Sequence, residues 1–146
     1  MVRRVLRVLS VAGIVGSTLL LGLAGTSSAV SKPKLTVTPS TNLKNGSTVK
    51  VSGTGFKAKD QIYITECLAK ATGEAGCSIN SVVGPFKITS KGVLPTTKFK
   101  LSTGKIGTGT CGTTKANLKK CSVSAGTESG TDSAVFVVTF ALPKKK

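Results

Sequence analysis

Residues 35–55 read LTVTPSTNLKNGSTVKVSGTG and contain two short segments, 35–38 and 49–52, in which apolar and polar residues alternate. A period of two places all the apolar side chains on one face of a β-strand and the polar ones on the other. The Asn45-Gly46 dipeptide between the segments is a turn signal. This stretch therefore predicts two strands, each with one buried face, joined by a turn.

The same alternation recurs downstream. Segments 62–65, 86–89 and 98–101 repeat it, and residues 134–140 are apolar on both faces. Glycine-rich turn signals separate the segments, and no stretch after residue 29 repeats apolar residues at the helical period of 3.6. Several short strands with such turns predict an antiparallel β-sandwich or barrel.

The first 29 residues have the three parts of a secretory signal peptide. Three arginines within residues 3–7 precede an apolar stretch, 8–24, and Ser27-Ser28-Ala29 provides small residues at a cleavage site. The alternative is a membrane anchor, because an uncharged stretch of about 20 residues is marginally long enough to span. The Gly and Ser interruptions and the cleavage motif favour the signal peptide, through either the general or the twin-arginine route. We therefore expect a secreted protein, with a β-sandwich over 30–142 and a basic tail over 143–146.

The charge balance and the missing residue types exclude several functions. The 146 residues include 21 basic and 5 acidic side chains, a formal net charge of +16, and no histidine. Without histidine there is no Ser-His or Cys-His pair and no histidine metal ligand. Outside the first 29 residues every basic residue is lysine, which meets phosphate as a point charge rather than as a bidentate fork. We expect a binding protein, with neither catalysis nor a metal.

The four cysteines, Cys67, Cys77, Cys111 and Cys121, all lie in the exported part. An even number of cysteines in a small secreted chain indicates disulfides. Three connectivities are possible, and the sequence favours two local loops, 67–77 and 111–121. The alternative of a zinc site fits poorly, because the spacing of ten includes no C-x-x-C pair.

The lysines fall into two groups. Those that alternate with apolar residues in predicted strands point outward and keep the sheet soluble. The others cluster in the second cysteine loop and at the C-terminus: Lys115, Lys119, Lys120, Lys144, Lys145 and Lys146. These clusters favour anionic partners such as a cell wall, an anionic lipid surface or nucleic acid. For DNA we expect salt-sensitive, non-specific binding, because five of the six aromatic residues lie in predicted strands, where packing in the core is their usual role.

Taken together, three parts of the chain resemble a known family. They are the first strands, 35–55, the spacing of Cys67 and Cys77 with Glu66 just before, and the close of the chain, 121–140. This combination resembles the neocarzinostatin family, the secreted actinobacterial apoproteins that carry enediyne chromophores. The resemblance covers about residues 34–140.

The resemblance implies an immunoglobulin-like, seven-stranded antiparallel sandwich with two disulfides, Cys67–Cys77 and Cys111–Cys121. It also implies a cleft at one end that shelters a labile aromatic chromophore, bound non-covalently, which damages DNA. The protein itself would be a monomeric carrier and no enzyme.

The positions that match the family's ligand contacts are the predicted cleft residues: Glu66, Ala69, Ala75, Val82, Val83 and Gly126. At several of them the family's large side chains are replaced by alanine or valine, and the loop Ser102–Thr110 is short and lacks an aromatic residue. Aromatic contacts supply much of the burial of a flat ligand, so binding of the same chromophore should be weaker or the cleft should accept a different molecule. The alternative function is a basic module of the same fold that has lost the chromophore site and binds polyanions.

Overall fold

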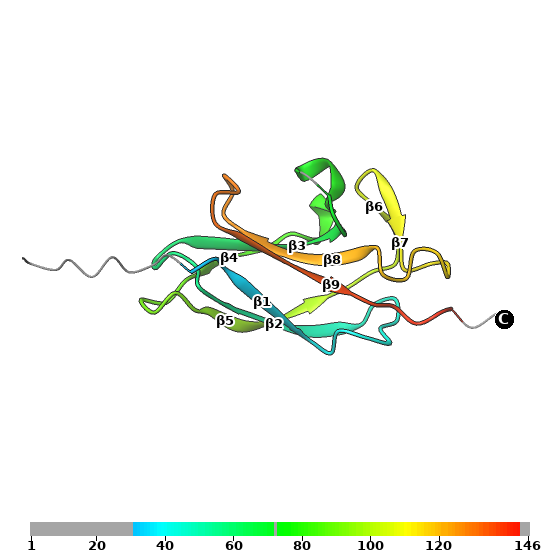
Figure 1. Cartoon of the computed structure of the whole chain (residues 1–146), viewed down its shortest axis with the longest axis horizontal. Coiled ribbons are helices and arrows are strands. Elements are labelled where there is room, and N and C mark those ends of the chain that lie inside the picture. The colour runs from blue at the N-terminus through cyan, green and yellow to red at the C-terminus, as the bar shows by residue number, and fades with distance from the viewer. Residues whose placement is uncertain (1–30, 72, 144–146) are drawn as a thin grey trace, which may run out of the picture.

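The computed structural model describes residues 31–71 and 73–143, which form two β-sheets packed face to face (Figure 1). The smaller sheet consists of β1 (Lys34–Thr38), β2 (Thr48–Thr54) and β5 (Leu94–Lys100), in the order β1-β2-β5. Both pairings are antiparallel. The apolar residues of β1 and the start of β2 are buried at every second position, as the sequence predicts.

The larger sheet has the order β4-β3-β8-β9 and is also antiparallel. Its strands are β4 (Val83–Lys87), β3 (Gln61–Leu68), β8 (Cys121–Gly126) and β9 (Ser133–Val138). Leu43, in the connection between β1 and β2, forms an isolated β-bridge with Phe140, which follows β9. This bridge ties the two sheets together.

A single apolar core fills the space between the sheets. Its fully buried members come from both layers and include Val49, Val51, Ile62, Ile64, Leu94, Leu101, Val123 and Val138. The inward residues of the two sheets interdigitate as in other aligned sandwiches. The predicted immunoglobulin-like sandwich is therefore confirmed.

Two details differ from the expectations. The two sheets supply seven strands, and a separate ribbon of β6 (Gly104–Ile106) and β7 (Gly109–Cys111) brings the number of named strands to nine. The segment expected as the loop Ser102–Thr110 thus contains most of a hairpin. Tyr63, one of the five aromatic residues in predicted strands, points outward from β3 rather than into the core, whereas Phe56, the one aromatic residue outside those strands, is buried.

Both local disulfides are present, Cys67–Cys77 and Cys111–Cys121. Of the three connectivities that the sequence allows, this is the one favoured. Since all four sulfurs are bonded in pairs, none is available as a thiolate ligand for zinc.

Helical structure in the described residues is limited to two 3-10 turns, η1 (Glu74–Gly76) and η2 (Ile79–Ser81). No helix of residues 31–71 and 73–143 is long and apolar enough to cross a membrane. The predicted signal peptide, 1–29, and the lysines Lys144, Lys145 and Lys146 lie outside the described residues, so the signal peptide and the basic tail stay predictions.

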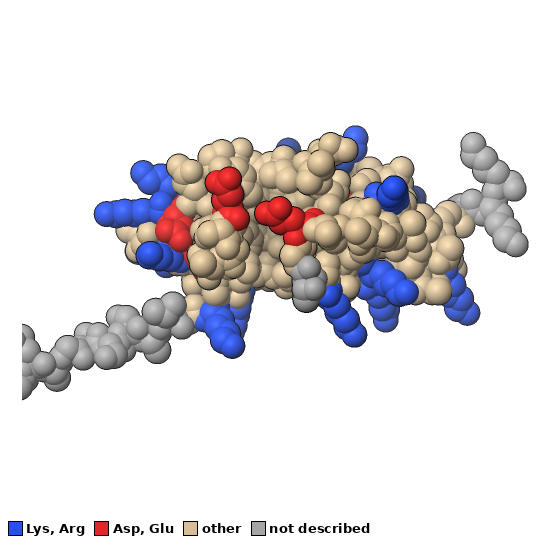
Figure 2. All heavy atoms as spheres, turned by 90° about the horizontal axis from the view of Figure 1, so that it is seen from above, with Lys and Arg blue, Asp and Glu red and all other residues tan. Residues whose placement is uncertain are grey.

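Charge is unevenly distributed over the surface. Figure 2 looks onto the outer side of the larger sheet, where acidic side chains lie near the middle and lysines project at the ends and margins. The three strands of the smaller sheet contain no acidic residue. The two outer faces of the sandwich therefore differ in charge.

Candidate ligand-binding cleft

The floor of a large cleft is the outer face of β3, β8 and β9. Because Ile62 and Ile64 of β3 point into the core, the alternation of the strand turns Tyr63, Thr65 and Cys67 outward. The matching outward residues of β8 and β9 are Ser122, Ser124, Gly126, Ser133 and Val135. Most of these side chains are small, so the floor leaves room above the sheet.

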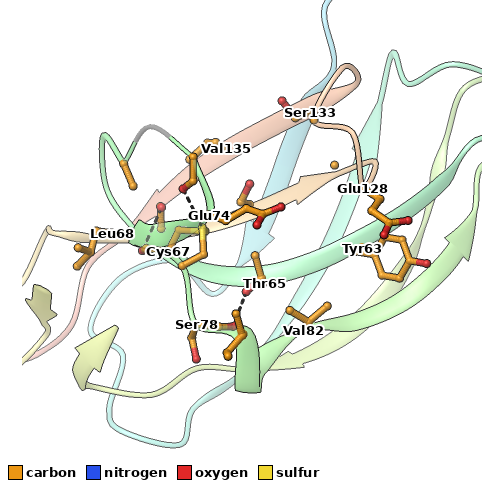
Figure 3. A pocket seen from close by; sticks show the side chains of 18 of the residues that line it. Tyr63, Thr65, Cys67, Leu68, Glu74, Ser78, Val82, Glu128, Ser133 and Val135 are labelled. Carbon is orange, nitrogen blue, oxygen red and sulfur yellow. Dashed lines mark hydrogen bonds between the residues drawn. A yellow bond between two sulfur atoms is a disulfide. The ribbon is translucent and has the colours of Figure 1, made fainter. Parts of the chain in front are cut away.

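Two loops rise from the floor and enclose a cleft of about 910 Å³ (Figure 3). One wall is the first disulfide loop with η1 and η2, and the other is the turn Thr127–Gly130 between β8 and β9. This volume lies in the range of small-molecule sites, about 300–1,000 Å³.

The first wall is fastened to β3 by more than the disulfide. The Thr65 hydroxyl donates to the Ser78 carbonyl at 2.9 Å, and the Ser78 N–H donates to the Glu66 carbonyl at 2.8 Å. The Ser81 hydroxyl also donates to the Ser78 carbonyl, at 2.9 Å, and accepts the Glu66 N–H at 3.1 Å. Together with the Cys67–Cys77 bridge, these bonds hold the wall in place along one end of the strand.

The β6–β7 ribbon supports the same wall from behind. Its turn residue Thr108 donates its N–H to the Ala75 carbonyl at 2.9 Å. At the neighbouring Gly107, whose φ is +51°, an added Cβ would collide with that carbonyl oxygen. Glycine therefore permits the ribbon to approach the loop closely.

Several large apolar side chains that are exposed to solvent line the cleft rather than pack in the core. Ile79 is 80 % exposed, Val135 59 % and Val82 47 %, and the ring of Tyr63 also lines the space. Exposed aliphatic groups gathered around a concavity favour an apolar ligand that removes them from water.

The rim of the cleft carries two carboxylates, Glu74 and Glu128, and one lysine, Lys70. Glu74 belongs to the disulfide loop and Glu128 to the opposite turn, so the acids approach the cleft from both walls. This rim disfavours an anionic ligand relative to a neutral or cationic one.

The six predicted cleft residues are divided by the structure. Val82 and Gly126 line the cleft. Ala69 and Ala75 lie in the disulfide loop without lining the cleft, and the Ala69 N–H donates to the Lys120 carbonyl at 2.7 Å. Val83 lines a second, smaller hollow instead. The ligand contacts of all these residues stay predictions.

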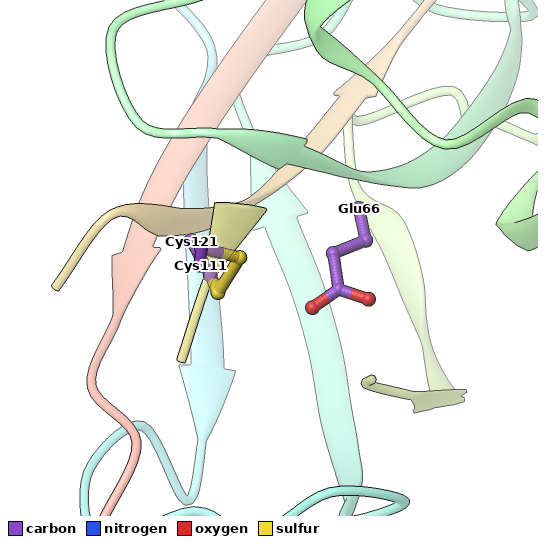
Figure 4. A group of neighbouring side chains, drawn as sticks. All are labelled: Glu66, Cys111 and Cys121. Atoms are coloured by element: carbon purple, nitrogen blue, oxygen red, sulfur yellow. A yellow bond between two sulfur atoms is a disulfide. The ribbon is translucent and has the colours of Figure 1, made fainter. Parts of the chain in front are cut away.

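Glu66 lies on the opposite face of β3 from the cleft floor and is completely buried. Its Oε2 accepts hydrogen bonds from the N–H and the hydroxyl of Ser102, both at 2.9 Å, whereas its Oε1 has no hydrogen-bond partner. Burial raises the pKa of this carboxyl, against the opposing effect of the two Ser102 hydrogen bonds. It lies beside the Cys111–Cys121 bridge, whose sulfurs are not thiolates, so this group is not a metal site (Figure 4).

Sequence reasoning missed most of the cleft floor. Tyr63, Thr65, Ser124 and Val135 were not predicted, although the alternation of β3 and β9 contained the necessary signal. Since Ile62 and Ile64 mark the core face, residue 66 belongs to that face and residues 63 and 65 to the other. The acids of the rim have no such signal, because loops bring them to the cleft.

The predicted basic cluster lies away from the cleft. Lys115, Lys119 and Lys120 are exposed in the loop between β7 and β8, which the second disulfide closes. Asn117 organises this loop: its Oδ1 accepts the N–H groups of Thr113 and Thr114, both at 2.8 Å.

The fold and the cleft define a class of protein: a small, twice disulfide-bonded β-sandwich with an open apolar cleft built on one sheet. The sequence profile of the neocarzinostatin family matches residues 35–140, and the chain belongs to this family of ligand-binding apoproteins. Macromomycin of Streptomyces macromomyceticus is 32 % identical over 114 residues, which cover 75 % of this chain and 77 % of macromomycin.

Solved structures agree with this assignment. A structure of macromomycin superposes with a TM-score of 0.57 at 30 % identity and covers 75 % of this chain and 99 % of its own. The solution structure of apokedarcidin has a TM-score of 0.51 at 22 % identity, covering 76 % of this chain and all of its own, and supports the fold alone.

Proposed function

We propose that this protein is a secreted, monomeric, non-catalytic carrier that holds a small, largely apolar ligand in the cleft. The observation that carries the proposal is the group of exposed aliphatic side chains in the cleft, Ile79 and Val82 on one wall and Val135 on a floor of otherwise mostly small residues. A bound ligand would remove these groups from water, at about 25 cal/mol for each Å² of apolar surface buried. Membership of the neocarzinostatin family supports an enediyne-type chromophore as the ligand, with antibacterial, DNA-damaging activity residing in that ligand.

The residues present fit a flat apolar ligand of moderate size. Ser124 and Gly126 keep the floor low, and the Tyr63 ring offers one aromatic face. Among the described residues that line the cleft, Tyr63 is the only aromatic one, so aliphatic contacts would provide most of the burial. The chromophore supplies the reactive chemistry when bound, and the chain's own residues bind it and exclude water.

A matched pair of dyes tests the cleft in solution. N-phenyl-1-naphthylamine is neutral, and 8-anilino-1-naphthalenesulfonate adds a negative charge to the same ring system. We expect saturable fluorescence enhancement with the neutral dye and weaker binding of the anionic one, because Glu74 and Glu128 lie on the rim. The double variant Glu74→Gln, Glu128→Gln should bring the affinities for the two dyes closer together without weakening the binding of the neutral dye.

A filled floor provides the matched control. Ser124→Phe places a ring inside the cleft and should weaken the binding of the neutral dye at least tenfold. Ser52→Phe adds the same ring to the outer face of the other sheet, at a similarly half-buried position, and should leave binding unchanged. Absence of saturable binding, or equal binding by the Ser124→Phe variant, would contradict a carrier role for the cleft.

The identity of the natural ligand is tested on the protein from its native culture medium, purified in the dark under mild conditions. The result expected for an enediyne-type cargo is an absorption band at longer wavelength than that of the protein itself, together with a small molecule in the mass spectrum. A colourless protein with both disulfides intact would contradict that cargo and leave the cleft open to a different ligand.

A further inference from the structure

The outer face of the smaller sheet is a flat array of lysine and hydroxyl side chains. On β1, β2 and β5 the outward positions are Lys34, Thr36, Thr38, Thr48, Lys50, Ser52, Thr54, Thr96, Lys98 and Lys100. We call this set the lysine face. It contains no aromatic residue and no acidic residue.

Two lysines of this face meet across neighbouring strands. Lys50 of β2 is directly opposite Lys98 of β5 in the antiparallel register. Side chains so placed start about 5 Å apart, and like charges in this position destabilise a sheet. Lys100 extends the cluster by one step along β5. The three ammonium groups therefore repel one another unless an anion lies between them.

A hollow lies at the edge of the same face. Lys98 and Lys100 line this hollow, whose other polar lining residues include Asn45, Asn80 and Ser102. The side chains of these residues include two amides and two ammonium groups, which donate hydrogen bonds to anions such as phosphate.

The composition of the lysine face limits the kind of polyanion. Without aromatic side chains it offers no stacking for the bases of a single strand. Without exposed aliphatic side chains other than Pro95, it offers nothing to insert among lipid chains. Lysine, serine and threonine contact phosphates, and without arginine the lysine face lacks the bidentate fork that most often reads guanine.

The rigidity of the face favours a rigid partner. Its lysines project from backbone positions held at strand spacing by a paired sheet, and a stiff duplex that presents phosphates at regular intervals is bound without the loss of chain entropy that a flexible polymer suffers. The acids Glu74 and Glu128, on the opposite outer side of the sandwich, repel the same partner. A duplex would therefore approach with the cleft facing away from it.

We propose that the lysine face, with the hollow beside β5, docks double-stranded DNA through its phosphates and without sequence preference. This interaction is independent of the ligand cleft. It uses a surface different from the predicted cluster at Lys115, Lys119 and Lys120.

The test compares two triple variants with the same change in net charge. One is Lys50→Thr, Lys98→Thr, Lys100→Thr, and the control is Lys115→Thr, Lys119→Thr, Lys120→Thr. Binding to a fluorescein-labelled 20-base-pair duplex of mixed sequence is followed by anisotropy between 25 and 200 mM NaCl. Because each neutralised phosphate contributes about 0.9 to the slope of log affinity against log salt, the first variant should lower the slope by about 2 to 3. The control should change it by less than 1.

A melting curve separates lost contacts from lost folding. The single variant Lys98→Thr removes the repulsion with Lys50, so its melting temperature at low salt should rise while its DNA affinity falls. Four results would overturn the proposal: no binding at 25 mM NaCl, an equal or larger loss in the control variant, tighter binding of a single strand of the same length, or tighter binding of vesicles containing anionic lipid.

Discussion

The two disulfide loops of this protein have the same length and different surroundings. Each bridge closes a loop with a sequence separation of 10. Cys111 and Cys121 are completely buried in the core, whereas Cys67 and Cys77 line the cleft. Both loops expose residues between their cysteines, and the loop 111–121 is organised around the buried Asn117.

This comparison separates two effects of a disulfide. Closing a loop of this length restricts the unfolded chain by roughly 3 kcal/mol, and this contribution is equal for both bridges. Any difference between them must therefore come from the folded state. The buried bridge is part of the packing, and the bridge in the cleft positions a wall.

The largest expected effect is on the buried bridge. The double variant Cys111→Ala, Cys121→Ala loses the loop closure and also leaves space beside Glu66 and the core, so it should destabilise the protein by about 4 kcal/mol. Because the chain contains no tryptophan to follow by fluorescence, urea unfolding monitored by far-UV circular dichroism measures the change. An effect smaller than that of the other bridge would contradict the assignment of a packing role.

Removing the bridge in the cleft should reduce stability less than removing the buried bridge does, and should reduce ligand binding more. Cys67→Ser, Cys77→Ser should lower the free energy of unfolding by about 2–3 kcal/mol, because Cys77 is only partly buried and the bridge contributes less packing beyond closure than the fully buried one. Binding of the neutral naphthylamine dye should fall at least tenfold, since the wall that carries Ile79 is released. Unchanged dye binding would show that the hydrogen bonds of Ser78 and Ser81 hold the wall without the disulfide.

A smaller effect is expected at Asn117. Its side chain accepts two backbone N–H groups and donates to the Thr113 hydroxyl at 3.1 Å. Asn117→Ala should cost about 1–2 kcal/mol, as loss of a capping side chain does elsewhere. Lys115→Ala, on the exposed part of the same loop, is the control and should change unfolding by less than about 0.5 kcal/mol. An Asn117 variant as stable as this control would contradict the role given to the amide.

The smallest effect is a pH dependence at Glu66, which directly precedes the first loop in sequence and lies beside the bridge that closes the second. Since burial raises its pKa in the folded protein above the ordinary 4.5, the protonated form is favoured by folding. The resulting stability is complete below the unfolded pKa and is lost as pH rises through the folded pKa. Compared with Glu66→Gln, the wild type should therefore gain stability as pH falls from 8 towards 4.5. The exposed Glu74→Gln variant is the control, and a difference between wild type and Glu66→Gln that stays constant over this range would contradict the prediction.

Much of the sandwich was predictable because its strands repeat a simple local pattern. Alternation at 35–38, 49–52 and 62–65 marks buried faces directly, and the structure places these segments in β1, β2 and β3. The β6–β7 ribbon was not predicted, because strands of three residues rich in glycine and threonine have too short a pattern to recognise.

The cleft was predictable only in part. Tyr63 and Thr65 could have been assigned to the outer face of β3 from the parity of Ile62 and Ile64, and the same parity places Glu66 in the interior. The cleft residues predicted from the family resemblance were matched by their position along the chain, without regard to which face they occupy. Two of them, Ala69 and Ala75, lie in the disulfide loop without lining the cleft.

The sequence by itself determined the strands, the buried face of most of them, the excess of lysine and the even set of cysteines, because these depend on residue type and near neighbours. Only the tertiary structure decided which sheet carries the cleft, that Glu74 and Glu128 both line it, and that Lys50 faces Lys98. Those are relations between residues far apart in the chain. They are fixed by the order of strands in each sheet and by the packing of the two sheets, which no local pattern encodes.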